Sequence, residues 1–179
     1  MPELISENSV ASNRLDTARP PSWQWQFVGL IGFLLLCFAA AAIGGRFTAM
    51  SVGDWYPTLA KPPLAPPAWV FGPVWTTLYT LMAIAAWLVW RRGGWRSQSG
   101  PLALFLVQLA LNVAWSGLFF GLRSPGLAFG EIVLLWLAIA ATASQFWRQS
   151  RAAALLLVPY LLWVTFAGYL NFGYWRLNG

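Results

Sequence analysis

The sequence predicts an all-α membrane protein, a polytopic bundle of five transmembrane helices. Only 9% of its 179 residues are charged, 59% are hydrophobic, and the mean hydropathy is +0.60. Apolar segments of roughly 20 residues, the length that a helix needs to cross a hydrocarbon core, occur five times. Runs such as 34–36 and 155–158 lack the polar and apolar alternation of a transmembrane barrel, so these segments are predicted to be helices.

The predicted spans are residues 23–45, 69–90, 102–121, 126–147 and 152–174, which together form one membrane domain over 23–179. Residues 1–22 are polar and mixed in charge, which predicts a disordered tail, and they lack the apolar core of a cleavable signal. The other connections are short, so consecutive helices should pack as antiparallel neighbours.

The connection over residues 46–68 is the longest, and it is rich in proline and aromatic residues. It runs through Asp54-Trp55-Tyr56-Pro57, Lys61-Pro62-Pro63 and Pro66-Pro67. Each proline fixes its own φ and restricts the residue before it, so the loop should be stiff. A stiff aromatic loop can serve as a lid.

Basic residues are divided unevenly between the two sides of the membrane that five crossings define. Seven lie on the N-terminal side and four on the other: Arg14, Arg19, Arg91, Arg92, Arg96, Arg148 and Arg151, against Arg46, Lys61, Arg123 and Arg176. This bias predicts a cytoplasmic N-terminus with the first loop opposite. The net charge of +6 is spread over short loops, which favours lipid headgroups over nucleic acid as partners.

The chemistry-bearing residues favour ligand binding over catalysis. The chain has no His, a single cysteine (Cys37) and five scattered acids, so we expect no catalytic residues and no metal site. Glu131 lies about a turn and a half into the fourth span, where we expect it to reach toward Arg123 or the headgroups rather than to relay protons.

The third span carries a polar face. Gln108, Asn112 and Trp115 are spaced i, i+4 and i+7, so they should lie on one side of the helix and point into the bundle or a cavity. Small residues lie almost opposite: Ala110, Ala114, Gly117 and Gly121. This small-residue face predicts a homodimer contact, with close packing inside one chain as the alternative.

Tryptophan is unusually frequent, with 13 copies. Five of them fit an interfacial belt at span ends: Trp23, Trp25, Trp90, Trp95 and Trp147. Others share a helix face with buried polar or small residues. On the fifth span this face comprises Tyr160, Trp163, Ala167, Asn171 and Tyr174, and on the second span Trp75 and Tyr79 are one turn apart.

Three motif groups resemble one known family. They are Trp55-Tyr56-x-x-Leu59-x-Lys61-Pro62 followed by Pro66-Pro67-x-Trp69-Val70-x-Gly72-Pro73-Val74-Trp75; Gln108-Leu109-Ala110-Leu111-Asn112-x-x-Trp115 with Phe119-Phe120-Gly121; and Pro159-Tyr160-Leu161-x-Trp163-x-x-Phe166-Ala167 with Leu170-Asn171. The sequence is similar to the TspO/MBR family of tryptophan-rich sensory proteins and translocator (peripheral benzodiazepine receptor) proteins.

This resemblance implies a five-helix bundle, usually dimeric, with a pocket under the first loop. In the family that pocket binds porphyrins, haem and other tetrapyrroles, and in some members sterols. Carried over to this chain, the ligand residues are Trp55, Trp69, Trp75, Asn112, Trp115, Trp163, Phe166 and Ala167, with Arg46 and Lys61 at the pocket mouth. The sterol motif is represented by Leu170, Tyr174 and Arg176, although Phe172 replaces a tyrosine of that motif.

The resemblance and the residues together predict a receptor or sensor for protoporphyrin IX, haem or another tetrapyrrole, with no obligatory cofactor. Indole faces stack on such flat rings, and the cations at the mouth suit their carboxylates. Two alternatives stay open: photo-oxidative degradation of the porphyrin, and transport of a tetrapyrrole, sterol or lipid.

Overall fold

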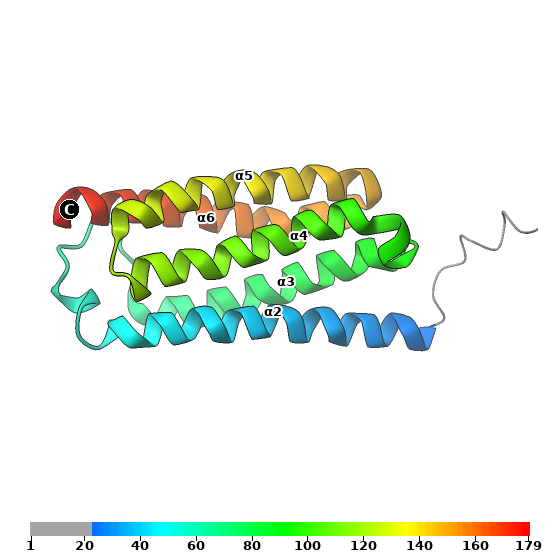
Figure 1. Ribbon diagram of the computed structural model, residues 1–179, viewed down its shortest axis with the longest axis horizontal. Coiled ribbons are helices and arrows are strands. Elements are labelled where there is room, and N and C mark those ends of the chain that lie inside the picture. The colour runs from blue at the N-terminus through cyan, green and yellow to red at the C-terminus, as the bar shows by residue number, and fades with distance from the viewer. Residues whose placement is uncertain (1–22) are drawn as a thin grey trace, which may run out of the picture.

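Five long helices account for most of the chain, as predicted. The computed structural model describes residues 23–179 (Figure 1), and the predicted tail at 1–22 lies outside them. The long helices are α2 (Trp23–Val52), α3 (Phe71–Trp90), α4 (Gly94–Ser116), α5 (Pro125–Gln149) and α6 (Arg151–Asn178). Three short helical turns lie between them: η2 (Tyr56–Thr58), η3 (Ala68–Val70) and the π-helical η4 (Gly117–Gly121). Five segments are long and apolar enough to cross a membrane: α2, η3 with α3, α4 with η4, α5 and α6.

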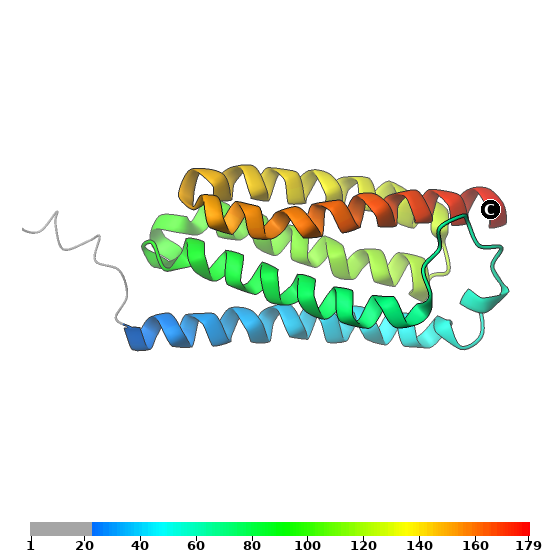
Figure 2. The same cartoon turned by 180° about the vertical axis from the view of Figure 1, so that it is seen from behind.

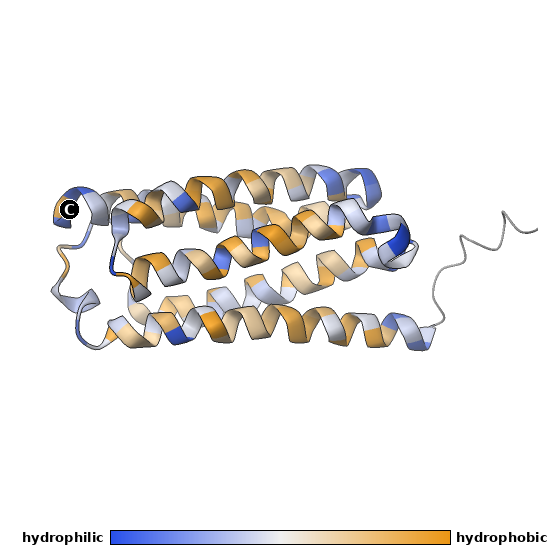
Figure 3. Cartoon of the chain, viewed as in Figure 1, coloured by the Kyte–Doolittle hydropathy of each residue, from blue (hydrophilic) through white to orange (hydrophobic). Residues whose placement is uncertain are grey.

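The helices form a closed ring in the order α2, α3, α6, α5, α4 (Figures 1 and 2). Three pairs of helices that are consecutive in the sequence pack closely: α2 with α3, α4 with α5, and α5 with α6. The fourth pair, α3 with α4, packs only weakly, because α3 packs mainly on α2 and α6. The core runs along the axis of the bundle and includes Met82, Phe105, Leu135 and Tyr160. The outer faces are apolar along the middle of the bundle and become hydrophilic at its ends (Figure 3). This is the arrangement of a five-helix membrane bundle.

Helix α2 is longer than predicted, and it shortens the lid loop. It continues to Val52 and therefore carries Arg46 on the helix rather than in the loop. A tertiary contact stabilises the extra turns, because Ser51 Oγ donates a hydrogen bond to the carbonyl oxygen of Phe120 at 2.5 Å. The connection that remains, residues 53–70, is called the strap below. It crosses one end of the bundle between α2 and α3 (Figure 2).

Helix α4 also begins earlier than the predicted span, at Gly94 rather than at residue 102. Gly93 and Gly94 have φ of +144° and +68°, left-handed values that favour glycine and allow the tight turn from α3. Gln98 leaves the helical conformation (φ −116°, ψ 20°) shortly before Pro101. Proline removes a backbone donor and crowds the preceding turn, which explains the kink.

Four of the five predicted belt tryptophans are exposed, and one is not. Trp23, Trp25, Trp95 and Trp147 lie on the outer surface near the helix ends. Trp90 is half-buried between α2 and α3, where its ring meets Phe33 edge to face at 6.4 Å. A Cβ at Gly29 would come within 2.3 Å of the Trp90 ring, so the absent side chain at 29 makes room for the indole.

Candidate functional site

The polar face predicted on the third span points into the bundle and joins three helices. Asn112 on α4 is only 2% exposed. Its Oδ1 accepts a hydrogen bond from the hydroxyl of Tyr79 on α3 at 2.5 Å, and its Nδ2 donates to the hydroxyl of Tyr160 on α6 at 2.9 Å. Buried polar groups in a membrane helix need partners, and here both ends of the amide have one.

A second polar link lies nearer the strap. The indole Nε1 of Trp115 donates to Asn171 Oδ1 at 2.9 Å, and Asn171 Nδ2 donates to the carbonyl oxygen of Pro125 at 2.7 Å. The Trp115 ring also stacks on Phe119 with centroids 5.3 Å apart. One indole and one amide thus connect α4, α5 and α6.

Two other predicted tryptophans belong to an aromatic cluster between α3 and α6. The ring of Trp75 lies 5.5 Å from that of Tyr79 and 6.4 Å from that of Tyr160. The ring of Trp163 lies 6.0 Å from Phe71 and 5.7 Å from Phe166. Both indoles are half-buried and pack against the core, as does Ala167. The structure therefore brings Trp75, Asn112, Trp163, Phe166 and Ala167 toward one region.

The strap is anchored to the C-terminal end of α6. The hydroxyls of Tyr56 and Tyr174 are hydrogen-bonded at 2.7 Å. The Asn178 side chain binds both backbone groups of Ala60, accepting from its N–H at 2.8 Å and donating to its carbonyl oxygen at 3.0 Å. Pro62 is buried, and its ring approaches Gly173 so closely that a Cβ there would lie 2.5 Å from Pro62 Cβ.

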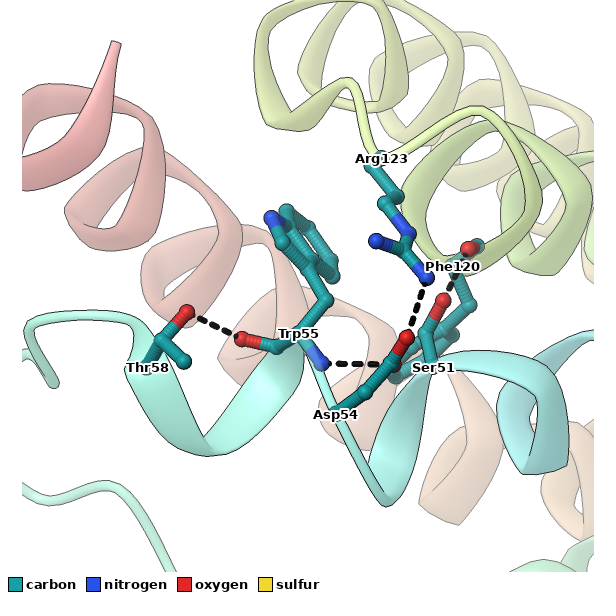
Figure 4. Close-up of polar contacts among 6 residues, drawn as sticks. All are labelled: Ser51, Asp54, Trp55, Thr58, Phe120 and Arg123. Carbon is teal, nitrogen blue, oxygen red and sulfur yellow. Dashed lines mark hydrogen bonds and ion pairs between the residues drawn. The ribbon is translucent and has the colours of Figure 1, made fainter.

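An ion pair, drawn in Figure 4, and a ring contact hold the start of the strap. Arg123 Nη2 lies 2.7 Å from Asp54 Oδ2, and Asp54 Oδ1 accepts from the Trp55 N–H at 2.6 Å. The Arg123 guanidinium, followed by the Trp55 N–H, lowers the pKa of the Asp54 carboxyl below its usual range. Arg123 has a φ of +52°, an uncommon conformation for a residue with a side chain. Trp55 packs edge to face on Phe119 at 5.9 Å.

The remaining predicted site residues lie outside this cluster. Trp69 is 75% exposed, and Lys61 and Arg46 are exposed on the strap and on α2. In the predicted sterol motif, Leu170 and Tyr174 are buried and Arg176 is exposed. Tyr174 thus faces the strap, and the three residues do not share one outer surface.

The expectation for Glu131 is wrong. The side chain is 9% exposed, and neither carboxylate oxygen has a partner among the described residues, while Arg123 pairs with Asp54 instead. Glu131 lies on the inward face of α5, which also carries Ala128, Leu135, Ile139 and Thr142. That periodicity was visible in the sequence and would have placed Glu131 inside the bundle.

The small-residue face of α4 divides into two parts. Gly117 and Gly121 face the Phe47 side chain of α2, and a Cβ at Gly121 would lie 3.1 Å from Phe47 Cδ1. Ala110 and Ala114 are exposed on the outside of the bundle. The alternative of packing within one chain therefore holds for the two glycines, while the two alanines stay free for a second copy.

Two hollows in the surface of residues 23–179 are lined by none of the predicted ligand residues. One, of about 740 Å³, lies at the end opposite the strap, and the other, of about 380 Å³, is an apolar groove between α5 and α6. Because the candidate tryptophans contact other aromatic rings, a planar ligand would have to separate these rings on entry. Residues 23–179 also contain no cluster of three His, Cys, Asp or Glu side chains that could hold a metal ion.

Some residues that shape the site were not in the predicted ligand set. Tyr79 and Tyr160 were assigned no ligand role, yet both hydroxyls bond to Asn112. Tyr56 and Phe119 take part in separate contacts between the strap and the bundle, because Tyr56 bonds to Tyr174 and Phe119 packs against the Trp55 ring. Helical spacing shows which residues share a face, but it does not show which residues on other helices they meet.

The fold and the site together define an integral, multi-pass membrane protein whose aromatic interior is closed at one end by a proline-rich strap. A family model described as the TspO/MBR family matches residues 33–176. The chain therefore belongs to the TspO/MBR family, as its motifs indicated.

Several curated relatives are similar over nearly their whole length. The chain is 45% identical to the tryptophan-rich protein TspO of Chlorobaculum tepidum over 144 residues, covering 80% of this chain and 91% of that relative. It is 41% identical to the translocator protein of Bos taurus over 160 residues, covering 88% and 92%. It is 40% identical to the tryptophan-rich sensory protein of Cereibacter sphaeroides over 146 residues, covering 82% and 89%.

Proposed function

We propose that this protein is a membrane receptor or sensor that binds a tetrapyrrole, such as protoporphyrin IX or haem, beneath the strap. The observation that carries the proposal is the aromatic cluster of Trp75, Tyr79, Tyr160 and Trp163, which lies between two helices and whose two tyrosine hydroxyls bond to Asn112. A porphyrin is a flat apolar ring with carboxylates on one edge, and indole and phenol rings suit its faces.

Binding requires the aromatic contacts to open. The ring pairs of Trp163 with Phe71 and of Trp75 with Tyr79 occupy the space that a planar guest would use. A ligand that stacks on these rings replaces contacts between side chains with contacts to itself, so the interior stays packed. The strap must move for the guest to enter, and its anchors to α6 and Arg123 are the contacts that would break.

This coupling gives the protein a way to report binding. When the strap is displaced, Tyr56, Ala60 and Pro62 lose their contacts with α6. The exposed cations Lys61 and Arg46 lie at the same end and can pair with the carboxylates of the pigment. Because the chain has no His, imidazole cannot ligate a haem iron, and a metal-free or weakly held ring is the guest that the residues favour.

A porphyrin titration tests the proposal. The purified full chain in detergent is titrated with protoporphyrin IX, and the porphyrin absorbance reports the bound fraction. Trp163→Ala should raise the Kd by about 2-fold to 10-fold, the loss expected for one aromatic pair. The control is Trp147→Ala, because Trp147 is exposed at the far end of α5.

Equal affinities for the wild type and both variants, each with an unchanged unfolding temperature, would contradict the proposal. Illumination of the bound complex distinguishes the alternative of degradation. If the protein only binds, the bound pigment bleaches no faster than free pigment in solution, whereas a degrading enzyme yields a new product spectrum.

The proposal also includes the orientation of the protein in the membrane. The arginines at the α3–α4 end favour a cytoplasmic location for that end.

A further inference from the structure

The end of the bundle opposite the strap contains a second candidate site. A hollow of about 740 Å³ lies between the turn that joins α3 to α4 and the turn that joins α5 to α6. Its lining comprises Leu88, Arg91, Arg92, Gln98 and Gln149, with Ser150 and Ala152 at the start of α6. None of these residues takes part in the aromatic cluster beneath the strap.

The hollow is strongly basic. Five arginines lie at this end of the bundle: Arg91, Arg92, Arg96, Arg148 and Arg151. The only acidic side chains within residues 23–179 are Asp54, which is paired with Arg123 at the strap end, and Glu131, which is buried in the half of α5 nearer the strap. No carboxylate of the described part of the chain therefore neutralises Arg91 and Arg92.

Neighbouring groups hold the Arg91 cation in place and add positive charge at the hollow. The Arg91 guanidinium lies over the ring of Trp87, 4.9 Å from its centroid, which holds the cation at the rim of the hollow. The first turn of α6 adds partial positive charge from its backbone N–H groups. Ser150 caps that helix by accepting from the Ala153 N–H at 3.4 Å, and it lines the hollow together with Ala152.

Gln98 supplies a different kind of group. It is 6% exposed and lines the hollow, and its Oε1 is buried with no hydrogen-bond partner among residues 23–179. The kink before Pro101 places Gln98 outside the regular helix. A buried carbonyl oxygen without a donor is unfavourable, so this atom favours a ligand that brings a hydroxyl or an N–H to it.

The position of the hollow indicates where such a ligand comes from. Its lining residues lie at the end of the bundle where the apolar spans give way to hydrophilic residues (Figure 3). Trp95 and Trp147, near the ends of α4 and α5 on the same side, are exposed, as expected in the headgroup region. A phospholipid headgroup that joins an anionic phosphodiester to a hydroxyl donor fits these groups at this depth, and phosphatidylglycerol is the simplest such lipid.

We propose that this hollow binds the headgroup of phosphatidylglycerol, with the phosphodiester at Arg91, Arg92 and the start of α6, and a glycerol hydroxyl at Gln98 Oε1. The proposal is independent of tetrapyrrole binding, because the two sites lie at opposite ends of the bundle.

Short-chain lipids test this proposal on the full chain in a neutral detergent at 150 mM salt. The probes are dioctanoyl-phosphatidylglycerol, dioctanoyl-phosphatidylmethanol, which has the phosphodiester without the hydroxyl, and inorganic phosphate. Native mass spectrometry counts the bound lipid, and a titration of the unfolding temperature gives the affinity. The wild type should bind phosphatidylglycerol about 2-fold to 10-fold more tightly than phosphatidylmethanol, the range for one neutral hydrogen bond.

Three variants separate the parts of the site. Arg91→Gln/Arg92→Gln should weaken binding of both lipids about 10-fold or more, because charge-assisted hydrogen bonds are lost. Gln98→Leu should abolish the preference for phosphatidylglycerol while retaining phosphatidylmethanol. Arg148→Gln/Arg151→Gln removes the same charge at the same end from side chains that do not line the hollow, and it should change either affinity less than 3-fold.

Equal losses in the two double variants would overturn the proposal and indicate only non-specific attraction to a basic surface. Stabilisation by inorganic phosphate equal to that by the lipid would overturn the assignment to a lipid headgroup. A Gln98→Leu variant that still prefers phosphatidylglycerol would overturn the assigned role of Gln98. Unfolding temperatures in lipid-free detergent show whether each variant is folded. The ratio of the affinities for the two lipids is measured within one variant, so it remains informative if the stability of that variant falls.

Discussion

The indole Nε1 of Trp115 donates to Asn171 Oδ1 at 2.9 Å and thereby joins α4 to α6 at the level where the strap closes the bundle. The amide of Asn171 continues the link to the carbonyl oxygen of Pro125 at the start of α5. A tryptophan that sequence reasoning assigned to ligand contact thus also has a structural role. Any ligand that rotates this indole would disturb the packing of three helices at once.

Replacing Asn171 should destabilise the bundle without direct effect on the strap. Asn171→Leu leaves the part-buried Trp115 N–H without its acceptor and removes the Asn171 donor from the Pro125 carbonyl oxygen, which costs about 1–3 kcal/mol. Unfolding by a denaturing detergent should shift accordingly. Gln145→Leu, at an exposed position on α5, is the matched control and should leave the transition unchanged. An Asn171→Leu protein as stable as the control would show that the link is dispensable.

Gly173 should be required for closure of the strap. A Cβ at this position would lie 2.5 Å from Pro62 Cβ, so Gly173→Ala must push the strap away from α6. Hydrogen exchange of the strap amides should become faster. Gly130→Ala on α5, where a Cβ meets nothing within 4 Å, should leave strap exchange as it is and stabilise its helix by up to about 1 kcal/mol. Equal exchange in the two variants would argue against a tight contact between Pro62 and α6.

Strap closure should depend on pH through Asp54. Its pKa is lowered in the folded state by Arg123, so the ion pair contributes above the ordinary carboxyl pKa of about 3.9 and is lost as the pH falls through the lowered value. At pH 7, Asp54→Asn should show faster strap exchange than the wild type, and the two should converge only once the pH has fallen below the lowered pKa of Asp54. The difference should be small and should shrink in 1 M salt, because the pair is exposed. A difference that does not shrink as the pH falls below the ordinary carboxyl pKa would assign it to something other than this charge.

Substitutions in the two halves of the small-residue face should have different effects, one on dimer formation and the other on stability. We propose that the exposed Ala110 and Ala114 contact a second copy, so Ala114→Ile should lower the dimer fraction seen by light scattering in detergent. Gly121→Val meets Phe47 within the same chain, so it should lower stability by about 1–3 kcal/mol and leave the dimer fraction unchanged. A dimer insensitive to Ala114→Ile would place the interface elsewhere.

The sequence determined the five spans, the inward polar face of α4 and the aromatic face of α6, because hydropathy and the helical repeat are local properties of the chain. It also indicated the family, since its Trp-, Pro- and amide-containing motifs resemble those of the TspO/MBR family in order and spacing.

Only the tertiary structure decided which side chains meet. It paired Asp54 with Arg123 and placed Tyr79 and Tyr160 on either side of Asn112. It also extended α2 beyond its apolar segment, through the contact of Ser51 with Phe120. These outcomes depend on how helices distant in sequence are rotated and spaced against one another, and the packing of the whole bundle fixes those quantities.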